Sequence, residues 1–382
     1  MANQRKTSGN NPKNIIPYGR QYLSWKDIFS VIKTLRSDWL TQGPIGPAFE
    51  KALAKIVGSR YAVAVSSGTA ALHLAYLASG LKEGDEVITT PNTFAATANM
   101  LLVLSAKPVF CDIREDTSNI DESKIESLIT EKTKAIVPVH FAGHPCAMEK
   151  IWDIASRHNL AVIEDAAHAL GAFYKNQPIG SGKSSMTIFS FHPVKSITTG
   201  EGGAIATDNQ ELYEKLKLLR SHGIRKNEQG FNVMTNLGFN YRLSDINSAL
   251  GLSQLKKLEN FIKKRQELAD FYFKELENFP EIILPAKDQS IRSSWHLFVI
   301  RTKNPEDRLP LYEYLKQSGI GINFHYPPVY SHPYYQENGF KNINLPIADL
   351  YAKTAITIPL YPGLTSKQIK KTISSIKNFF SK

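Results

Sequence analysis

The sequence is poor in cysteine and has no long apolar run. Its only two cysteines, Cys111 and Cys146, have neither the spacing of a zinc site nor the pattern of a disulfide framework, so we expect a reducing compartment and no bound metal. No stretch approaches the roughly 20 apolar residues of a membrane span. The polar segment Met1–Pro12 also lacks the apolar core of a signal peptide. These absences predict a cytoplasmic protein that does not bind membranes.

Low-complexity tracts and internal repeats are absent as well, which argues against a solenoid or an array. The composition, with 42% apolar and 21% charged residues, is typical of a globular α/β protein. The formal net charge of +11 would suit an anionic partner. However, the basic residues are interleaved with Glu along Leu212–Arg220 and Leu255–Arg265 instead of forming one aromatic-flanked patch. A solvated, lysine-rich surface is therefore favoured over a nucleic-acid-binding face.

Apolar β-branched runs alternate with amphipathic segments as far as Thr207, and this alternation indicates a mostly parallel sheet. The seven expected strands are Tyr61–Val65, Glu86–Thr90, Pro108–Asp112, Ala135–His140, Leu160–Asp165, Met186–Phe191 and Gly203–Thr207. Ser67 is expected to cap the helix over residues 68–79, and Asp121 the helix over residues 122–129.

At 382 residues the chain is longer than one hydrophobic core usually grows, so two domains are expected. A long helix begins at Ser244 and keeps its apolar spacing as far as Leu258. Beyond Asn260 the chain has several prolines and fewer continuous apolar runs, and a closing helix is expected over Lys367–Phe379. We therefore predict a disordered tail over residues 1–14, a large domain over 15–258 and a small α+β domain over 259–382.

Open α/β sheets bind ligands beyond the carboxyl ends of their strands, and suitable residues follow four of the expected strands. Small residues follow the first strand, in Ser66-Ser67-Gly68-Thr69-Ala70. The N–H groups and the dipole of the helix that begins there would bind a phosphate, with the Thr69 hydroxyl as a further donor. The alternative is a tight turn without a ligand.

Two further strands end in or are followed by charged residues that could bind the same small heterocyclic ligand. Asp165 ends the strand from Leu160, and Lys195 follows the next strand in Ser190-Phe191-His192-Pro193-Val194-Lys195. Adjacent strands lie about 4.8 Å apart, so both side chains can reach the same ligand. Alone, the acid could cap a helix and the lysine could be solvated. Together with the phosphate site they match pyridoxal phosphate, which needs an anion at its ring nitrogen, an amine for its aldehyde and donors for its phosphate.

The fourth place is Asn92-Thr93-Phe94, after the strand that ends at Thr90. The flat ring of Phe94 would stack on the pyridine face of the cofactor. The alternative is that Phe94 is a core residue. Its position beyond the carboxyl end of a strand, which the other three places share, favours stacking.

The same residues lie in a series of motifs that resembles the DegT-type sugar aminotransferases. In chain order the motifs are SSGTAAL, TTPNTFAATANM, EDAAHALGA, FSFHPVKSITTGEGG, RSHG and GFNYRLSDINSALGLSQL, and the resemblance covers nearly the whole folded chain. It implies the aspartate aminotransferase fold, which is fold type I of the pyridoxal-phosphate enzymes. It also implies a homodimer with active sites at the subunit boundary.

The resemblance assigns a role to individual residues. Lys195 would form the Schiff base with pyridoxal phosphate, and Asp165 would pair with the pyridine nitrogen. His168 would lie near the ring oxygen. The implied phosphate ligands are Gly68, Thr69, Ala70, Ser190 and, from the other subunit, Asn240. Some members of the family replace the lysine by His and catalyse dehydration, but this chain keeps Lys195.

Segments near both ends of the chain narrow the resemblance to the 4-aminotransferases of pseudaminic acid biosynthesis. They are Ile16–Gln21 with Ser37–Pro44, and Ile356–Leu360. The implied reaction moves the amino group of L-glutamate to the C4 ketone of UDP-2-acetamido-2,6-dideoxy-β-L-arabino-hex-4-ulose. His325, in the aromatic and proline-rich segment Gly319–Tyr335, would contact this substrate. The alternative is that this segment only packs against the rest of the protein.

Three other functions remain open from the sequence. The nearest is the same chemistry on another nucleotide-linked keto sugar, such as a D-configured UDP-4-keto, a GDP-4-keto or a 3-keto sugar. The second is a regulator that binds pyridoxal phosphate without turnover. The third is a nucleic-acid-binding protein, which only the net charge supports and which would bind DNA in a salt-sensitive manner without a cofactor.

Overall fold

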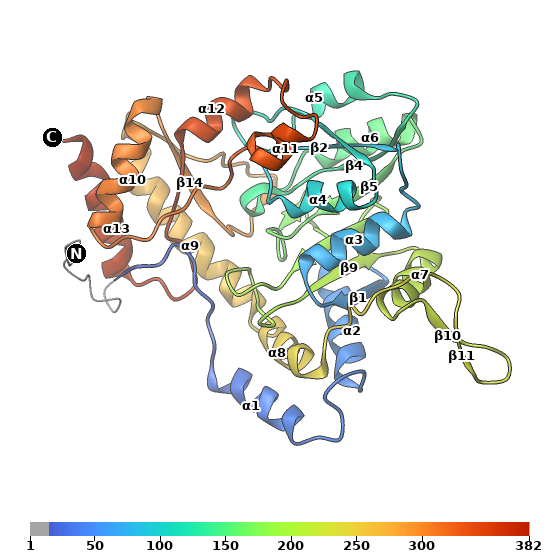
Figure 1. The fold of residues 1–382 in the computed structure, drawn as a ribbon. Coiled ribbons are helices and arrows are strands. Elements are labelled where there is room, and N and C mark those ends of the chain that lie inside the picture. The colour runs from blue at the N-terminus through green and yellow to red at the C-terminus, as the bar shows by residue number, and fades with distance from the viewer. Residues whose placement is uncertain (1–14, 382) are drawn as a thin grey trace, which may run out of the picture.

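The computed structural model describes residues 15–381, and its centre is a seven-stranded sheet (Figure 1). The strands lie in the order β1 (Tyr61–Val65), β9 (Gly203–Thr207), β8 (Met186–Ser190), β5 (Ala161–Asp165), β4 (Thr133–Val137), β2 (Glu86–Thr89) and β3 (Lys107–Phe110). β9 is antiparallel to both of its neighbours, and the other pairs are parallel. The mostly parallel sheet expected from the sequence is confirmed. The tail predicted over residues 1–14 lies outside the described residues.

The fourth expected strand ends earlier than its apolar pattern suggests. β4 stops at Val137 and not at His140, because Pro138 has no N–H group to donate to a ladder. The chain then forms a short 3-10 turn over Phe141–Gly143. Asp165 N still donates to Pro138 O, and His140 N donates to Asp165 O. The loop after β4 therefore holds the end of β5, where Asp165 lies.

Helices cover both faces of the sheet and give the protein three layers (Figure 1). They are α2 (Ile45–Val57), α3 (Gly68–Ala78), α4 (Ala96–Val103), α6 (Met148–Arg157), α7 (Gln210–Arg220) and α8 (Asp245–Leu255). α3, α4 and α7 pack on one face, and α2, α6 and α8 pack on the other. In β1, Val63 and Val65 face the first set, whereas Ala62 and Ala64 face the second. A strand buried on both faces needs apolar residues at successive positions, and this sequence provides them.

The helix expected from Ser244 to Leu258 is divided into two helices. α8 starts after Ser244, whose Oγ accepts a hydrogen bond of 3.2 Å from Asn247 N. α9 (Leu258–Leu276) follows after a turn that contains Lys257. The ammonium group of Lys257 pairs with buried Asp27 in α1 (Trp25–Leu35). The expectation of one continuous helix was wrong at this point, because residues 256 and 257 form a turn between the two helices.

The C-terminal part forms a second core around a three-stranded sheet. The strands lie in the order β12 (Ile282–Ile283), β14 (Phe298–Thr302) and β15 (Ala355–Ile358). Helices α10 (Arg308–Gln317) and α13 (Ser366–Phe380) pack against this sheet, so the expected smaller α+β part and its closing helix are confirmed. α9 contributes Leu258 and Ile262 to the first core and Tyr272 and Leu276 to the second. The domain boundary at residue 258 stays a prediction.

The remaining elements are short or peripheral. They are α5 (Glu122–Ile125), α11 (Pro333–Glu337), α12 (Pro346–Thr354), a small sheet of β13 (Ile291–Arg292), β6 (Phe173–Tyr174) and β7 (Gln177–Pro178), and the hairpin of β10 (Ile224–Lys226) and β11 (Asn232–Met234). In Figure 1, α1 and this hairpin project from the body of the molecule. Within residues 15–381, no helix is long and apolar enough to cross a membrane.

Candidate active site

A cavity of about 640 Å³ lies beyond the carboxyl ends of β5 and β8. The predicted site residues that line it are Gly68, Thr69, Phe94, Asp165, His168, Ser190, Lys195 and His325. Ala70 and Asn240 do not line it. The lining residues come from the loops after β1, β2, β5 and β8 and from the C-terminal part, so the fold brings distant parts of the chain to one site.

Asp165 is 4% exposed and lies at the end of β5. Its Oδ2 accepts a hydrogen bond of 2.7 Å from Thr97 Oγ1, and its Oδ1 accepts one of 3.1 Å from Ala167 N. Both donors are neutral, and no cation within residues 15–381 forms an ion pair with this carboxylate. A buried carboxylate without a cationic partner is costly. This end of the cavity therefore suits a ligand that carries positive charge, such as a protonated ring nitrogen.

Lys195 lies on the loop after β8, where its backbone N–H donates to His192 O at 2.9 Å. Asn247 Nδ2 holds the same loop by donating to Thr199 O at 2.6 Å. Burial lowers the pKa of the Lys195 amine from the usual 10.5 to about 8, although the charge of Asp165 acts in the opposite direction. The neutral amine is the nucleophilic form, so this lysine is suited to condense with an aldehyde near neutral pH.

The first turn of α3 carries the predicted anion site. Ser67 caps this helix, and its Oγ accepts a hydrogen bond of 3.0 Å from Ala70 N. Because the Ala70 N–H is engaged in the cap, the N–H groups left for an anion are those of Gly68 and Thr69. Ser190 lies directly beside Gly68, since a Cβ at position 68 would come within 3.0 Å of Ser190 Cβ. The absence of a side chain at Gly68 lets the two segments lie side by side at the cavity wall.

His168 and Tyr326 form a hydrogen-bonded pair at the cavity wall. Ala142 N donates to His168 Nδ1 at 3.3 Å, so the proton of the neutral ring is on Nε2, which lies 3.1 Å from Tyr326 Oη. Burial lowers the pKa of His168 well below its usual value and keeps the ring neutral. Tyr326 Oη therefore accepts this bond, and its own proton is available to the cavity. Sequence reasoning missed Tyr326, whose only signal was its place next to His325.

The structure also decides between alternatives for other predicted residues. Phe94 is 64% exposed and lines the cavity, so it is not a core residue; its stacking role stays a prediction. The ring of His325 lies with Nδ1 2.7 Å from Thr357 Oγ1, and burial lowers its pKa to about 3. Asn240 is exposed and pairs with Ser221 outside the cavity. A role for Asn240 in phosphate binding therefore requires a second chain.

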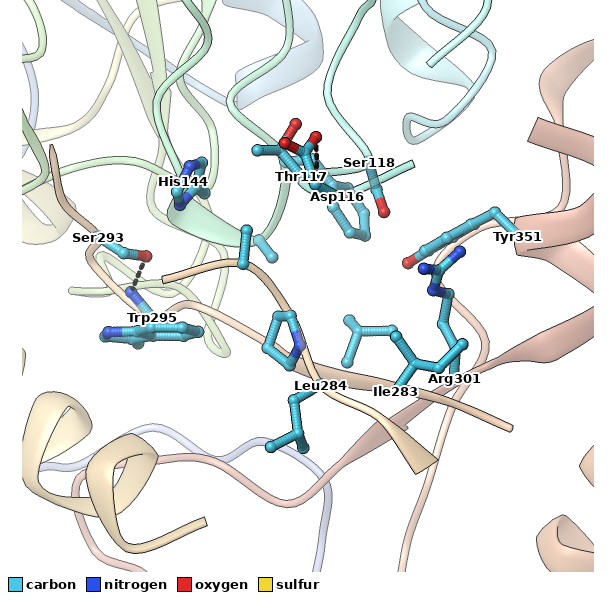
Figure 2. Close-up of a pocket in the computed structure, with 15 residues that line it drawn as sticks. Asp116, Thr117, Ser118, His144, Ile283, Leu284, Ser293, Trp295, Arg301 and Tyr351 are labelled. Atoms are coloured by element: carbon cyan, nitrogen blue, oxygen red, sulfur yellow. Dashed lines mark hydrogen bonds between the residues drawn. The ribbon is translucent and has the colours of Figure 1, made fainter. Parts of the chain in front are cut away.

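A second cavity, of about 30 Å³, lies between the Asp116–Ser118 loop and the C-terminal part (Figure 2). Figure 2 shows the Arg301 guanidinium beside the Tyr351 hydroxyl and His144 at the other end of the cavity. This volume holds about one or two water molecules. None of the residues predicted to bind a cofactor lines it, so the 640 Å³ cavity is the candidate active site.

Comparison with protein families distinguishes between the functions left open by the sequence. Residues 23–377 match the sequence model of the DegT/DnrJ/EryC1/StrS aminotransferase family. The chain belongs to this family. It is therefore an enzyme, and the sugar aminotransferase activity that the motifs implied is confirmed. Net charge alone supports the nucleic-acid-binding alternative.

Relatives and solved structures agree with this assignment. The aminotransferase is 43% identical over 372 residues to the UDP-4-amino-4,6-dideoxy-N-acetyl-beta-L-altrosamine transaminase of Campylobacter jejuni, covering 95% of this chain and 97% of the relative. It is similar to Helicobacter pylori PseC, an aminotransferase involved in the biosynthesis of pseudoaminic acid, with 36% identity, a TM-score of 0.92 and coverage of 96% and 99%. It is also similar to the PLP form of a putative sugar aminotransferase from Streptococcus pneumoniae, with 30% identity, a TM-score of 0.92 and coverage of 96% and 99%. Fold type I and the pyridoxal phosphate cofactor are confirmed.

Proposed function

We propose that this enzyme transfers the amino group of L-glutamate to the C4 ketone of UDP-2-acetamido-2,6-dideoxy-β-L-arabino-hex-4-ulose in pseudaminic acid biosynthesis. The observation that carries the proposal is the convergence of Asp165, Lys195 and the start of α3 on one cavity. The printed functions of the C. jejuni and H. pylori relatives support the choice of acceptor. The volume of about 640 Å³ is in the usual range for small-molecule sites.

The residues of the cavity fit pyridoxal phosphate. Asp165 is a buried carboxylate that forms no ion pair within residues 15–381, Lys195 is an amine of lowered pKa, and the start of α3 offers neutral donors to a phosphate. The bound cofactor supplies an aldehyde that condenses with amines and a ring that accepts electrons. Phe94 would stack on the face of that ring, and Thr69 and Ser190 would add hydroxyl donors to its phosphate.

Lys195 has two tasks in the proposed reaction. Its amine would hold the cofactor through the aldehyde group and would be released when the amino donor binds there. The freed amine would then act as the base that takes the proton from the Cα of glutamate and returns it on the side of the cofactor. In the second half of the reaction the same amine moves a proton in the opposite direction, to C4 of the sugar. Asp165 keeps the proton on the ring nitrogen throughout.

Two other groups would orient the ligands. Tyr326 Oη, held by His168, is a neutral donor that suits the ring oxygen of the cofactor. His325 lines the same cavity and would contact the sugar beside Asn323, whose Nδ2 lies 3.4 Å from His325 Nε2. Because burial keeps both histidines uncharged at neutral pH, they bind by hydrogen bonding and not by ion pairing.

We expect cofactor uptake to depend on pH through the Lys195 amine. Because the amine must be neutral to attack an aldehyde, the rate at which apoprotein takes up pyridoxal phosphate should rise with pH and reach half of its maximum near the lowered pKa of about 8. Stopped-flow absorbance measures this rate, with a peptide that contains one exposed lysine as the control. A midpoint equal to that of the control peptide would contradict the effect of burial.

The acceptor can be identified with purified protein loaded with pyridoxal phosphate. Glutamate alone should remove the visible absorbance of the cofactor, and the proposed keto sugar should restore it and yield an aminated product by mass spectrometry. The same assay with D-configured UDP-4-keto, GDP-4-keto and 3-keto sugars compares the alternatives. Turnover of one of these sugars instead would refute the acceptor but keep the activity. A spectrum that glutamate leaves unchanged would favour a regulator without turnover.

We also propose that the enzyme acts as a homodimer, because α1 turns its apolar side outwards. Its polar side contacts α8, where Ser30 Oγ donates to Ala249 O at 2.9 Å and Asp27 Oδ1 accepts from Ser253 Oγ at 2.7 Å. The exposed residues in and after α1 include seven large apolar ones beside Lys26, Lys33, Arg36 and Asp38: Trp25, Ile28, Phe29, Ile32, Leu35, Trp39 and Leu40. Such a patch is unusual on a monomer. A second copy of the chain would cover it and would bring its exposed Asn240 to the shared site.

We expect Phe29→Asp to separate the dimer into chains of 42.7 kDa, because a charge in an apolar interface has no partner. Activity should fall at least about tenfold, since ligands from the second chain are lost. Analytical ultracentrifugation and the glutamate assay measure the two effects. The matched control is Leu309→Asp, because Leu309 on α10 is 58% exposed and Phe29 is 63% exposed. A fully active wild-type monomer would refute the homodimer.

A further inference from the structure

Two threonine hydroxyls form a chain of hydrogen bonds that ends at Asp165. Thr93 Oγ1 lies 2.8 Å from Thr97 Oγ1, and Thr97 Oγ1 lies 2.7 Å from Asp165 Oδ2. All three residues are buried, with exposed fractions of 3%, 1% and 4% in that order, and all three line the active-site cavity. A buried hydrogen bond to an ionised acceptor is stronger than one between neutral groups.

The direction of these bonds follows from the chemistry of the acceptor. An ionised carboxylate can only accept, so the single hydroxyl proton of Thr97 points to Asp165. The bond between the two threonines is then donated by Thr93. The donors therefore run from Thr93 to Thr97 to Asp165, and each bond polarises the next one in the same direction.

The backbone around Thr97 is held independently of this chain. Thr97 N donates to Phe94 O at 3.2 Å, and Thr97 O accepts from Tyr76 Oη at 3.0 Å. Asp165 is held from the other side, because its Oδ1 accepts from Ala167 N at 3.1 Å. With one donor on each oxygen, the carboxylate cannot rotate freely, and each oxygen keeps a lone pair for a further donor.

We propose that Thr97, supported by Thr93, is a positioning residue for transamination: its hydroxyl fixes Asp165 Oδ2 and stabilises the charged carboxylate, so that the proton stays on the ring nitrogen of the cofactor. This inference rests on the proposed function of Asp165. A hydrogen bond to the charged form of an acid favours that form. Without it, Asp165 Oδ2 would have no donor to fix its direction toward the ring.

The test compares four variants of the holoenzyme. Thr97→Val removes the hydroxyl at nearly constant volume, Thr97→Ser keeps it, and Thr93→Val removes only the outer bond. Thr89→Val is the matched control, because Thr89 is fully buried on β2 and its Oγ1 donates to the neutral Val137 O at 2.8 Å, outside the cavity. The visible absorbance of the bound cofactor is recorded as a function of pH in the absence of substrate. For each variant we also measure kcat, KM for glutamate and the melting temperature of the apoprotein.

We expect Thr97→Val to move the pH midpoint of the visible absorbance upwards by about half a unit or more. The reason is that a less protonated ring withdraws fewer electrons from its bond to Lys195, which then keeps its proton to higher pH. kcat should fall about tenfold with little change in KM, as expected for loss of a hydrogen bond to a charged group. Thr93→Val should shift the midpoint less in the same direction, and Thr97→Ser should restore both values.

Equal spectra and equal kcat for Thr97→Val and Thr89→Val would overturn the inference while the proposed function stands. A Thr97→Ser variant as impaired as Thr97→Val would also overturn it, because the hydroxyl would then not be the cause. If the wild-type protein did not bind pyridoxal phosphate, both the proposed function and this inference would be refuted. A lower melting temperature alone, equal in the Thr97→Val and Thr89→Val apoproteins, would indicate a structural role and refute positioning.

Discussion

Lys195→Ala is expected to abolish turnover, with a loss of about 10⁴-fold or more, because we propose that this one amine is both the attachment point of the cofactor and the base that moves its protons. The fold should be unaffected. Burial already disfavours the charged amine, as its lowered pKa of about 8 indicates, so no stabilising ion pair is lost with it. The glutamate half-reaction, followed by absorbance, measures the activity, and the melting temperature measures the fold.

Two control variants separate the chemistry of Lys195 from its charge. Lys195→Arg keeps a positive charge but cannot condense with an aldehyde, so it should be as inactive as the alanine variant. Lys183→Ala removes an exposed lysine that does not line the cavity and should keep full activity. Borohydride reduction followed by peptide mass spectrometry should find the cofactor bonded to Lys195 in the wild-type and Lys183→Ala proteins, and not in the two Lys195 variants. An active Lys195→Ala enzyme would refute the assigned role.

Asp165→Asn should lower kcat/KM by about 10²–10³-fold, which is the usual cost of losing one preorganised electrostatic contact in an active site. The amide keeps the shape of the side chain, but its single oxygen can accept from only one of the two donors, Thr97 and Ala167, and it carries no charge to hold a proton on the ring nitrogen. Steady-state kinetics and the absorbance of the bound cofactor measure the effect. A cofactor analogue methylated at the ring nitrogen keeps its positive charge without the acid and should restore part of the activity.

The neighbouring acid provides the control for Asp165. Glu164 is equally buried, but its side chain contacts His140 at 2.7 Å and does not line the cavity. Glu164→Gln should therefore change stability without changing the pH titration of the cofactor. If Asp165→Asn left kinetics and spectrum at wild-type values, the assignment of Asp165 to the ring nitrogen would be wrong.

Much of the candidate site was predictable because its residues directly follow apolar strands. Asp165 and Lys195 come from β5 and β8, which are parallel neighbours in the sheet, so their side chains reach the same edge. Ser67 was predictable as the cap of α3, and its bond to Ala70 N confirms this. The sequence did not indicate that this bond occupies the Ala70 N–H. The N–H groups of Gly68 and Thr69 are therefore the proposed donors to the phosphate.

Other parts of the site depend on contacts between segments far apart in the chain. Thr97 meets Asp165 across 68 positions, and His168 meets Tyr326 across 158 positions. Sequence periodicity describes which side of a helix or strand is apolar, but it does not describe which polar atoms meet when two elements pack. Thr93 and Thr97 therefore looked like ordinary residues of a motif until the packing of α4 against the sheet was known.

By itself, the sequence determined the order of strands and helices along the chain and the family, and it predicted which residues bear the reactive amine and acid, because these are properties of local patterns and motifs. Only the tertiary structure decided which hydroxyls reach Asp165, which nitrogen of His168 carries the proton and why α1 exposes its apolar side. Those outcomes depend on how separate elements pack, and packing selects hydrogen-bond partners by distance and direction, which spacing along the chain does not record.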